Sequence, residues 1–171
     1  MDPAGCYRLT EDVTITAPFP AVFTGSLDGD GHTVALVLTA QADTVSLALF
    51  PETDGASIRA LTLTGTVFAG EDSGLAYAAA LVGTASGDTA VTACKTEVQL
   101  DIAVPGASVG GLTAAQLDGT LTLTGCASAG EITAPQAAFT GGLVGRQEPY
   151  STLTLQSCYQ AADITGGTEE G

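Results

Sequence analysis

The segment Asp28-Gly29-Asp30-Gly31-His32 holds the densest group of side chains that could do chemistry. Hard cations such as Ca²⁺ bind several oxygen ligands, so Asp28 and Asp30 are calcium candidates. An EF-hand loop beginning at Asp28 would need a glutamate where the chain has Thr39. Aspartates and glycines at this spacing are also typical of a tight turn whose carboxylates accept backbone N–H groups. The turn is the favoured interpretation, so no cofactor is expected, and calcium binding is the lower alternative.

His32 is the only histidine of the chain. Beside an aspartate, an imidazole could act as a general base. A single histidine in a polar turn is more often a structural residue, and we expect that role here.

Cys94, Cys126 and Cys158 follow one another at intervals of 32 residues (126 − 94 and 158 − 126). A structural zinc site would need four converging ligands, usually with a Cys-x-x-Cys pair, which this chain lacks. On stacked parallel strands the three cysteines would lie within disulfide range, but their Cβ atoms would point the same way and strain a bridge. We therefore expect free, buried thiols that pack as small apolar side chains. The pairing of Cys6, outside this series, stays open.

The same interval runs through the whole chain as an internal repeat. Four apolar columns keep their spacing through four copies. The columns are Leu49, Leu81, Leu112 and Leu143; Ile58, Val91, Leu123 and Leu155; Leu61, Cys94, Cys126 and Cys158; and Val67, Leu100, Ile132 and Ile164.

Each copy consists of short strands separated by bends, as in 120–124, where leucines alternate with threonines. Such a unit cannot bury its own apolar face, but stacked units can, with parallel strands about 4.8 Å apart. The sequence therefore predicts an all-β fold, a right-handed parallel β-helix of about five coils with an atypical N-terminal capping segment. A β-sandwich is the alternative, although it would not normally keep four columns at a fixed period.

A small-residue phrase recurs beside the first column and is clearest in Phe-Thr-Gly-Gly-Leu-Val-Gly at 139–145. We expect it at a corner where every coil bends. Gly141, Gly142 and Gly145 would supply unusual backbone angles and close approach, and the leucine would point into the core.

The expected organisation is a single domain that is a piece of a larger protein. Residues 1–46 form an N-terminal cap and first coil, residues 47–165 form four repeats, and 166–171 read as a linker or tail. The C-terminal end shows no comparable cap. It could pair with another chain, which predicts end-to-end self-association, or with further repeats.

The formal net charge of −15, from 19 acidic and 4 basic residues, argues against nucleic acid as a partner. An anionic membrane surface is disfavoured for the same reason, and no apolar run approaches the roughly 18 residues of a membrane span, so no membrane insertion is expected. The acidity fits a soluble secreted protein, and a cation-dependent assembly module is a lower alternative.

Several segments together resemble the GLUG-motif repeat proteins. They are Tyr7 to Ile15, Phe23 to Val34, Gly141 to Gly145, and the hydrophobe–x–x–Cys step from Leu155 to Cys158. The copies at 47–51 and 110–114 depart from the pattern. The resemblance covers nearly the whole chain. It implies a β-helix of a bacterial cell-surface or secreted, adhesin-like protein, and no catalytic residues.

The predicted function is therefore a non-catalytic structural or adhesive module, with binding through the loops 69–78, 103–109 and 133–139. Its partner would be a host or bacterial surface protein or a glycan. The alternative is a carbohydrate-binding or carbohydrate-active β-helix, whose signature would be a groove that gathers tyrosines, acids and arginines. The four basic residues, Arg8, Arg59, Lys95 and Arg146, are scattered along the sequence. Arg59, Lys95 and Asp101 fall on neighbouring coils, so a small polar patch is possible there. Because the basic residues are otherwise scattered, an enzyme is disfavoured.

Overall fold

The computed structural model describes residues 2–166, and within them every regular element is a β-strand. The strands form four parallel sheets, numbered here in the order in which the chain first visits them. The first sheet comprises β1 (Cys6–Arg8), β3 (Ser26–Asp28), β7 (Ser57–Arg59), β11 (Asp88–Thr92), β15 (Thr120–Thr124) and β20 (Thr152–Gln156). The second comprises β2 (Val13–Ile15), β4 (Thr33–Thr39), β8 (Thr62–Ala69), β12 (Lys95–Ile102), β16 (Ala127–Ser128), β17 (Glu131–Thr133), β21 (Tyr159–Gln160) and β22 (Asp163–Thr165). The third comprises β5 (Ser46–Leu47), β9 (Tyr77–Ala79), β13 (Ser108–Gly110) and β18 (Phe139–Gly141). The fourth comprises β6 (Phe50–Asp54), β10 (Val82–Ser86), β14 (Thr113–Gln116) and β19 (Val144–Gln147).

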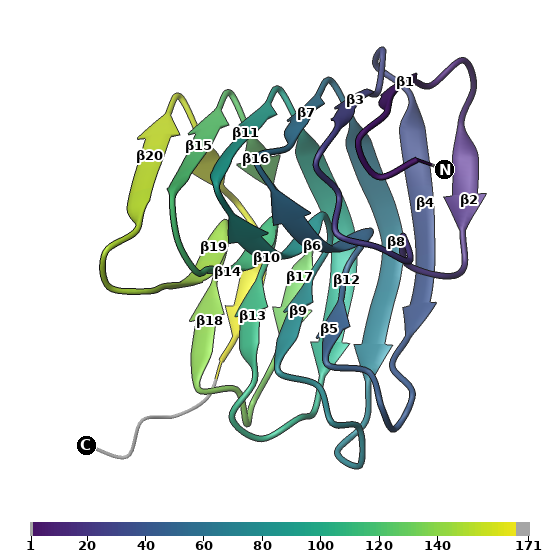
Figure 1. The fold of residues 1–171 in the computed structure, drawn as a ribbon. Coiled ribbons are helices and arrows are strands. Elements are labelled where there is room, and N and C mark those ends of the chain that lie inside the picture. The colour runs from purple at the N-terminus through teal and green to yellow at the C-terminus, as the bar shows by residue number, and fades with distance from the viewer. Residues whose placement is uncertain (1, 167–171) are drawn as a thin grey trace.

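The chain visits the four sheets in turn and then returns to the first, so that it winds as a solenoid (Figure 1). The predicted all-β parallel solenoid is confirmed, with about four turns, slightly fewer than the five expected. The coil count was too high because both ends contribute incomplete turns: β1 and β2 before the first full turn, and β20 to β22 after the last. The right-handed sense stays a prediction. The expected division after residue 46 falls inside β5, and of the expected tail only Gly166 belongs to the described residues.

The apolar columns found in the sequence are ladders in the core. Ile58 pairs with Val91, Val91 with Leu123, and Leu123 with Leu155. The fourth column is likewise paired through Val67, Leu100, Ile132 and Ile164. Cys94, Cys126 and Cys158 lie in consecutive layers. The strand pairing on both sides of them shows this, since Thr92, Thr124 and Gln156 are in register before the cysteines and Lys95, Ala127 and Tyr159 are in register after them.

The glycines of the recurring phrase allow close approach of the backbone, as predicted. The prediction that they supply unusual backbone angles is wrong. Gly141, Gly142 and Gly145 have no positive φ. A Cβ on Gly141 would lie 2.0 Å from the Val144 carbonyl oxygen, and one on Gly145 would lie 2.4 Å from that of Val109. These glycines let the third and fourth sheets fold against each other across a short corner. A positive φ angle recurs instead at the corner directly before the third column, at Ala60, Ala93, Gly125 and Ser157.

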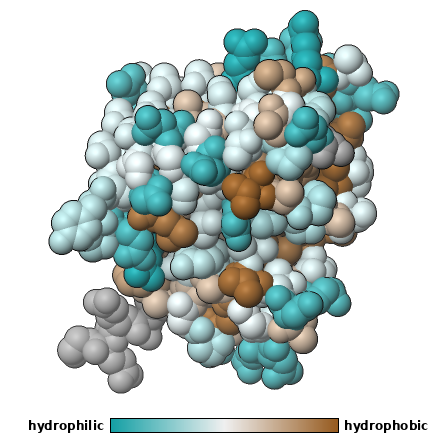
Figure 2. Space-filling view, viewed as in Figure 1, coloured by the Kyte–Doolittle hydropathy of each residue, from teal (hydrophilic) through white to brown (hydrophobic). Residues whose placement is uncertain are grey.

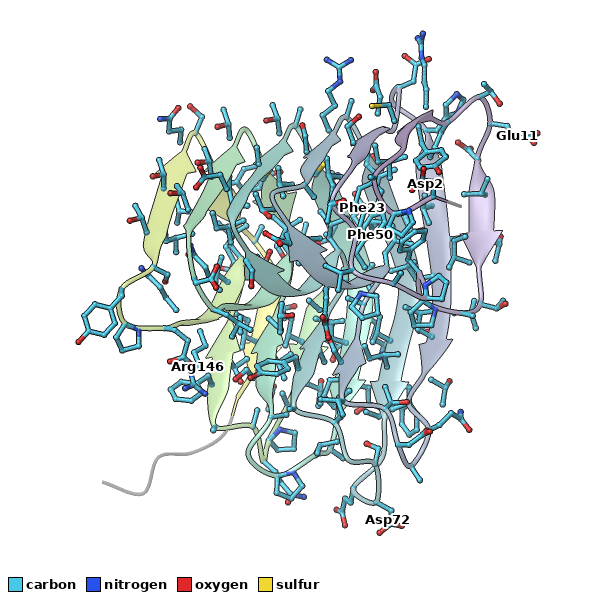
Figure 3. All side chains as sticks on the ribbon, viewed as in Figure 1. Asp2, Glu11, Phe23, Phe50, Asp72 and Arg146 are labelled. Atoms are coloured by element: carbon cyan, nitrogen blue, oxygen red, sulfur yellow. The ribbon has the colours of Figure 1, made fainter. Side chains whose placement is uncertain are left out.

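The N-terminal end of the core is covered by the segment that follows β2. The Phe19 and Phe23 N–H groups donate to the carbonyls of Leu49 and Glu52, so this segment runs along β6. The rings of Phe19, Phe23 and Phe50 pack together, with centroids of Phe23 and Phe50 4.5 Å apart (Figure 3). This aromatic cover is the physical form of the atypical N-terminal cap.

Candidate functional sites

The Asp28–His32 segment is a corner with two residues more than the corner stacked upon it. Asp28 is in register with Arg59 and Thr33 with Thr62, so four residues stand where the next turn has only Ala60 and Leu61. Asp30 and Gly31 absorb the extra length with φ angles of 51° and 81°. The insertion pushes the Asp30 side chain outward, into reach of β1.

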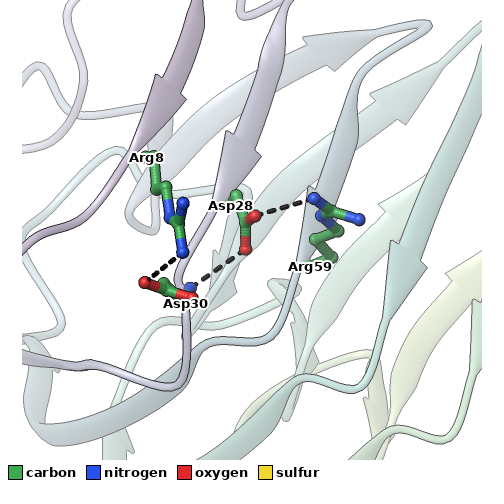
Figure 4. Close-up of polar contacts among 4 residues, drawn as sticks. All are labelled: Arg8, Asp28, Asp30 and Arg59. Carbon is green, nitrogen blue, oxygen red and sulfur yellow. Dashed lines mark hydrogen bonds and ion pairs between the residues drawn. The ribbon is translucent and has the colours of Figure 1, made fainter.

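The carboxylates of this corner are engaged by guanidinium groups (Figure 4). Arg59 Nη2 lies 2.7 Å from Asp28 Oδ2, and Arg8 Nη2 lies 2.6 Å from Asp30 Oδ2. The Asp30 N–H donates to Asp28 Oδ1 at 3.0 Å. This backbone hydrogen bond, followed by the Arg59 guanidinium, lowers the pKa of Asp28. The geometry supports the turn interpretation, and no group of three or more potential metal ligands is present among residues 2–166.

His32 belongs to the same corner. Its Nδ1 lies 3.2 Å from Asp12 Oδ1, which also accepts the Thr33 N–H at 2.8 Å. These two contacts, the backbone one first, lower the pKa of Asp12. His32 thus helps to hold Asp12, the residue directly before β2, against the first full turn.

The cysteines are all free thiols. Cys94 and Cys126 are buried, Cys158 is half-buried and Cys6 is exposed. Burial raises the pKa of Cys94 to about 12 and also raises that of Cys126. The Sγ atoms of Cys126 and Cys158 lie 3.4 and 3.3 Å from the Val91 and Leu123 carbonyl oxygens, in the turns above them. Protonated thiols of this kind pack as apolar side chains and react slowly.

The structure brings Arg8 and Arg59 together at the Asp28–His32 corner, while Lys95 and Arg146 lie elsewhere. Lys95 pairs with Glu97 and Arg146 with Glu148, while the two arginines of the corner pair with Asp28 and Asp30. Lys95 and Asp101 stand near opposite ends of β12, about 20 Å apart at the rise of a strand. The patch of Arg59, Lys95 and Asp101 is therefore not assembled.

The C-terminal end of the solenoid leaves its ladders uncovered. Leu123 and Cys126 are fully buried, but their successors Leu155 and Cys158 are 49% exposed and half-buried. Ile164 is 41% exposed below Ile132, which is 1% exposed. The strands β18, β19, β20, β21 and β22 are terminal strands of their sheets, so their outer backbone groups have no strand partner within residues 2–166.

The structure contains a cleft between the third and fourth sheets that the sequence patterns did not predict. It has a volume of about 350 Å³ and lies mainly over the first two turns, with Leu117 contributed by the third. Ser46 and Tyr77 line it from the third sheet, and Glu52, Asp54, Thr84 and Ser86 line it from the fourth. Exposed Val22 and Val45 form its rim. In the view of Figure 2 the apolar residues appear as separate patches among polar ones, with no single apolar face.

The residues of the two walls belong to columns in register that continue along the solenoid, where Ser108 and Ala115 of the third turn are buried. The third sheet contributes Ser46, Tyr77, Ser108 and Phe139 in register, and the fourth contributes Glu52, Thr84, Ala115 and Arg146. Near the C-terminal end, the Arg146 guanidinium covers the Phe139 ring at 5.0 Å (Figure 3). Most of these residues stand four before or three after each leucine of the first column, which is the signal that could have revealed the cleft.

Comparisons with family models, curated proteins and solved structures found no match. The resemblance to GLUG-motif proteins therefore stays a prediction. In residues 2–166 no helix has the length and apolar character that a membrane span requires.

Proposed function

We propose that this chain is a non-catalytic structural and adhesive β-solenoid module of a bacterial cell-surface or secreted protein, and that two copies stack through their C-terminal ends. The observation that carries the proposal is the loss of cover on the core ladders between Leu123 and Leu155. A ladder of apolar side chains under four open sheet edges is complementary to another solenoid turn.

The partner at this end is a second copy of the chain, which binds through its own C-terminal end. The segment Phe19–Thr24 lies along β6 and closes the fourth sheet at the N-terminal end, so a head-to-tail contact could not continue all four sheets. The C-terminal end carries no such segment in the described residues. Contact through like ends is isologous and closes as a two-fold dimer, whereas a head-to-tail contact would propagate.

The adhesive role is supported by the connections between the second and third sheets. Loops 70–76, 103–107 and 134–138 lie side by side along one edge of the solenoid, as Figure 1 shows at the bottom of the view. Gln136 Nε2 donates to Glu71 Oε1 at 3.2 Å, and the Gly106 N–H donates to the Gln136 carbonyl at 2.9 Å. The solenoid thus holds three loops from different repeats as one displayed surface, with Asp72 at its outer edge (Figure 3).

Sedimentation of the chain from micromolar to millimolar concentration tests the stacking. The expected result is a monomer–dimer equilibrium that Leu155→Lys shifts to monomer, because a charge would be buried between the two ends. Val37→Lys is the matched control, since Val37 is 53% exposed on β4, away from the open end. A chain that stays monomeric throughout, or a dimer that Leu155→Lys leaves intact, would contradict the proposal. Growth into filaments would show a head-to-tail contact instead.

A further inference from the structure

The cleft between the third and fourth sheets has the size and walls of a ligand site. Its volume of about 350 Å³ lies within the range of small-molecule sites, roughly 300 to 1,000 Å³. The residues around the cleft are closely packed. A Cβ on Gly83, which precedes the lining residue Thr84, would lie 1.9 Å from Ser46 Oγ and 2.5 Å from the Pro51 carbonyl oxygen. The Ser46 hydroxyl of the third sheet also donates to the Pro51 carbonyl of the fourth at 2.8 Å, so a hydrogen bond and close packing tie the two walls together.

The aromatic residue of the cleft is positioned rigidly. Tyr77 is half-buried and packs against Ala48, Ala79 and Ala114, a small apolar cluster separate from the main core. Three alanines from three consecutive turns support one side of the residue, and the cleft lies on another. A tyrosine held in this way presents a flat apolar surface with a polar tip at small cost in side-chain entropy.

The opposite wall is rich in hydrogen-bond acceptors. Glu52 and Asp54 are exposed on alternate positions of β6, and neither carboxylate forms an ion pair with a basic group of residues 2–166. An ionised carboxylate only accepts hydrogen bonds, so its natural partners are hydroxyl or ammonium donors. The hydroxyl groups of Thr84 and Ser86, on the neighbouring strand, can both donate and accept.

This combination selects among ligand classes. An extended peptide would bind most readily along a free strand edge. Strands β9 and β10 are paired on both sides, the outer edge of β6 is occupied by the Phe19–Thr24 segment, and the free edge of β5 is only two residues long. An anionic ligand would meet two unpaired carboxylates on a chain of net charge −15. A neutral or amino sugar fits both walls, because its apolar ring face can lie on Tyr77 while its hydroxyl or ammonium groups donate to Glu52 and Asp54.

We propose that the cleft formed by Ser46, Glu52, Asp54, Tyr77, Thr84 and Ser86 binds neutral or amino-sugar oligosaccharides. The proposal rests on the adhesive part of the proposed function and gives it a ligand class. It is independent of the stacking through the C-terminal ends, because the cleft lies mainly over the first two turns.

The test is titration calorimetry of the full chain with four tetrasaccharides: a neutral β-glucan, chitotetraose, its deacetylated form and an anionic oligogalacturonate. We expect binding of at least one of the first three and none of the anionic one. Glu52→Gln and Tyr77→Leu should each weaken that binding about tenfold, the equivalent of about 1.4 kcal/mol, as for a lost hydrogen bond to a charged group or a lost ring contact. Tyr150→Leu and Glu11→Gln are the matched controls, since both residues are exposed and neither lines the cleft.

Thermal melting of each variant separates loss of binding from loss of fold, and Glu52→Gln, at an exposed position, keeps the test valid if Tyr77→Leu is unstable. Absence of binding by all three neutral and amino sugars in the millimolar range would overturn the proposal. So would binding of the anionic sugar, or binding that Glu52→Gln does not weaken. Sedimentation of the same samples distinguishes this failure from that of the proposed function. If the chain dimerises but binds no sugar, only the proposal of sugar binding in the cleft is rejected.

Discussion

Leu123 and Leu155 are neighbours in one ladder of the first sheet, yet Leu123 is fully buried and Leu155 is 49% exposed. The two residues have the same type, strand position and register, so they differ in the layer that covers them. The pair therefore measures what a further solenoid turn contributes to the core.

Replacement of each leucine by alanine should give unequal losses of stability. Leu123→Ala should lower the free energy of unfolding by about 2–5 kcal/mol, because it leaves a cavity between two occupied layers. Leu155→Ala should cost roughly half as much or less, because half of its side chain is already in water. Urea unfolding at a concentration where the chain is monomeric measures both. Equal losses would mean that something covers the end.

The glycines of the third and fourth sheets should be intolerant of a single methyl group. A Cβ on Gly110 would lie 1.9 Å from the Thr113 carbonyl oxygen, and both partners are backbone in paired strands. Gly110→Ala should therefore lower the free energy of unfolding by at least about 1–3 kcal/mol. Gly70→Ala is the control, since Gly70 has no positive φ and a Cβ there would meet nothing within 4 Å. An unchanged urea midpoint for Gly110→Ala would refute close approach as the reason for this glycine.

The ladder register could be predicted because period and side-chain type report the same physical constraint. A column such as Ile58, Val91, Leu123 and Leu155 must stay apolar in every copy if it is to be buried. The number of turns was less accessible, since the chain from Phe19 to Thr24 covers the core without entering a regular strand pattern.

The cleft was harder to predict because its residues vary from copy to copy. At one position the third sheet carries Ser46, Tyr77, Ser108 and Phe139, which share neither polarity nor size. A repeat search finds what copies have in common, and a ligand site on a solenoid lies where they differ. The conformation of the Gly-Gly corner was mispredicted for a related reason: glycine composition does not distinguish a positive φ from the need for space.

Acid should weaken the corner around Asp28. Its pKa is lowered in the folded chain, by the Asp30 N–H first and then by Arg59, from an ordinary value of 3.8. A lowered folded pKa contributes stability above the unfolded pKa, and this contribution is lost as the pH falls through the folded pKa. The melting temperature of the wild type should therefore fall more steeply below about pH 4 than that of Asp28→Asn.

Asp72→Asn serves as the reference for this comparison, because Asp72 is exposed on the loop 70–76 and shows no ion pair within the described residues. The effect should be small, since the Asp28–Arg59 pair is open to solvent and screened. It should also shrink with added salt. If the pH profiles of wild type and Asp28→Asn were parallel between pH 2.5 and 6, the corner would contribute nothing to acid sensitivity.

The four thiols should react with a disulfide reagent at rates that follow their layers. Cys6 is exposed and should react first, whereas Cys94 is 1% exposed with a pKa raised to about 12, and Cys126 is fully buried. Only the thiolate attacks a disulfide, so the two buried cysteines should react only through opening of the fold. Absorbance of the released thiol at pH 8 should show one fast phase, a slower phase from half-buried Cys158, and two thiols that appear on addition of urea. Cys6→Ser should remove the fast phase alone.

Because stacking of two copies would cover Cys158, raising the protein concentration should slow the Cys158 phase and leave the Cys6 phase unchanged. A Cys158 rate that is independent of protein concentration would place the dimer contact elsewhere.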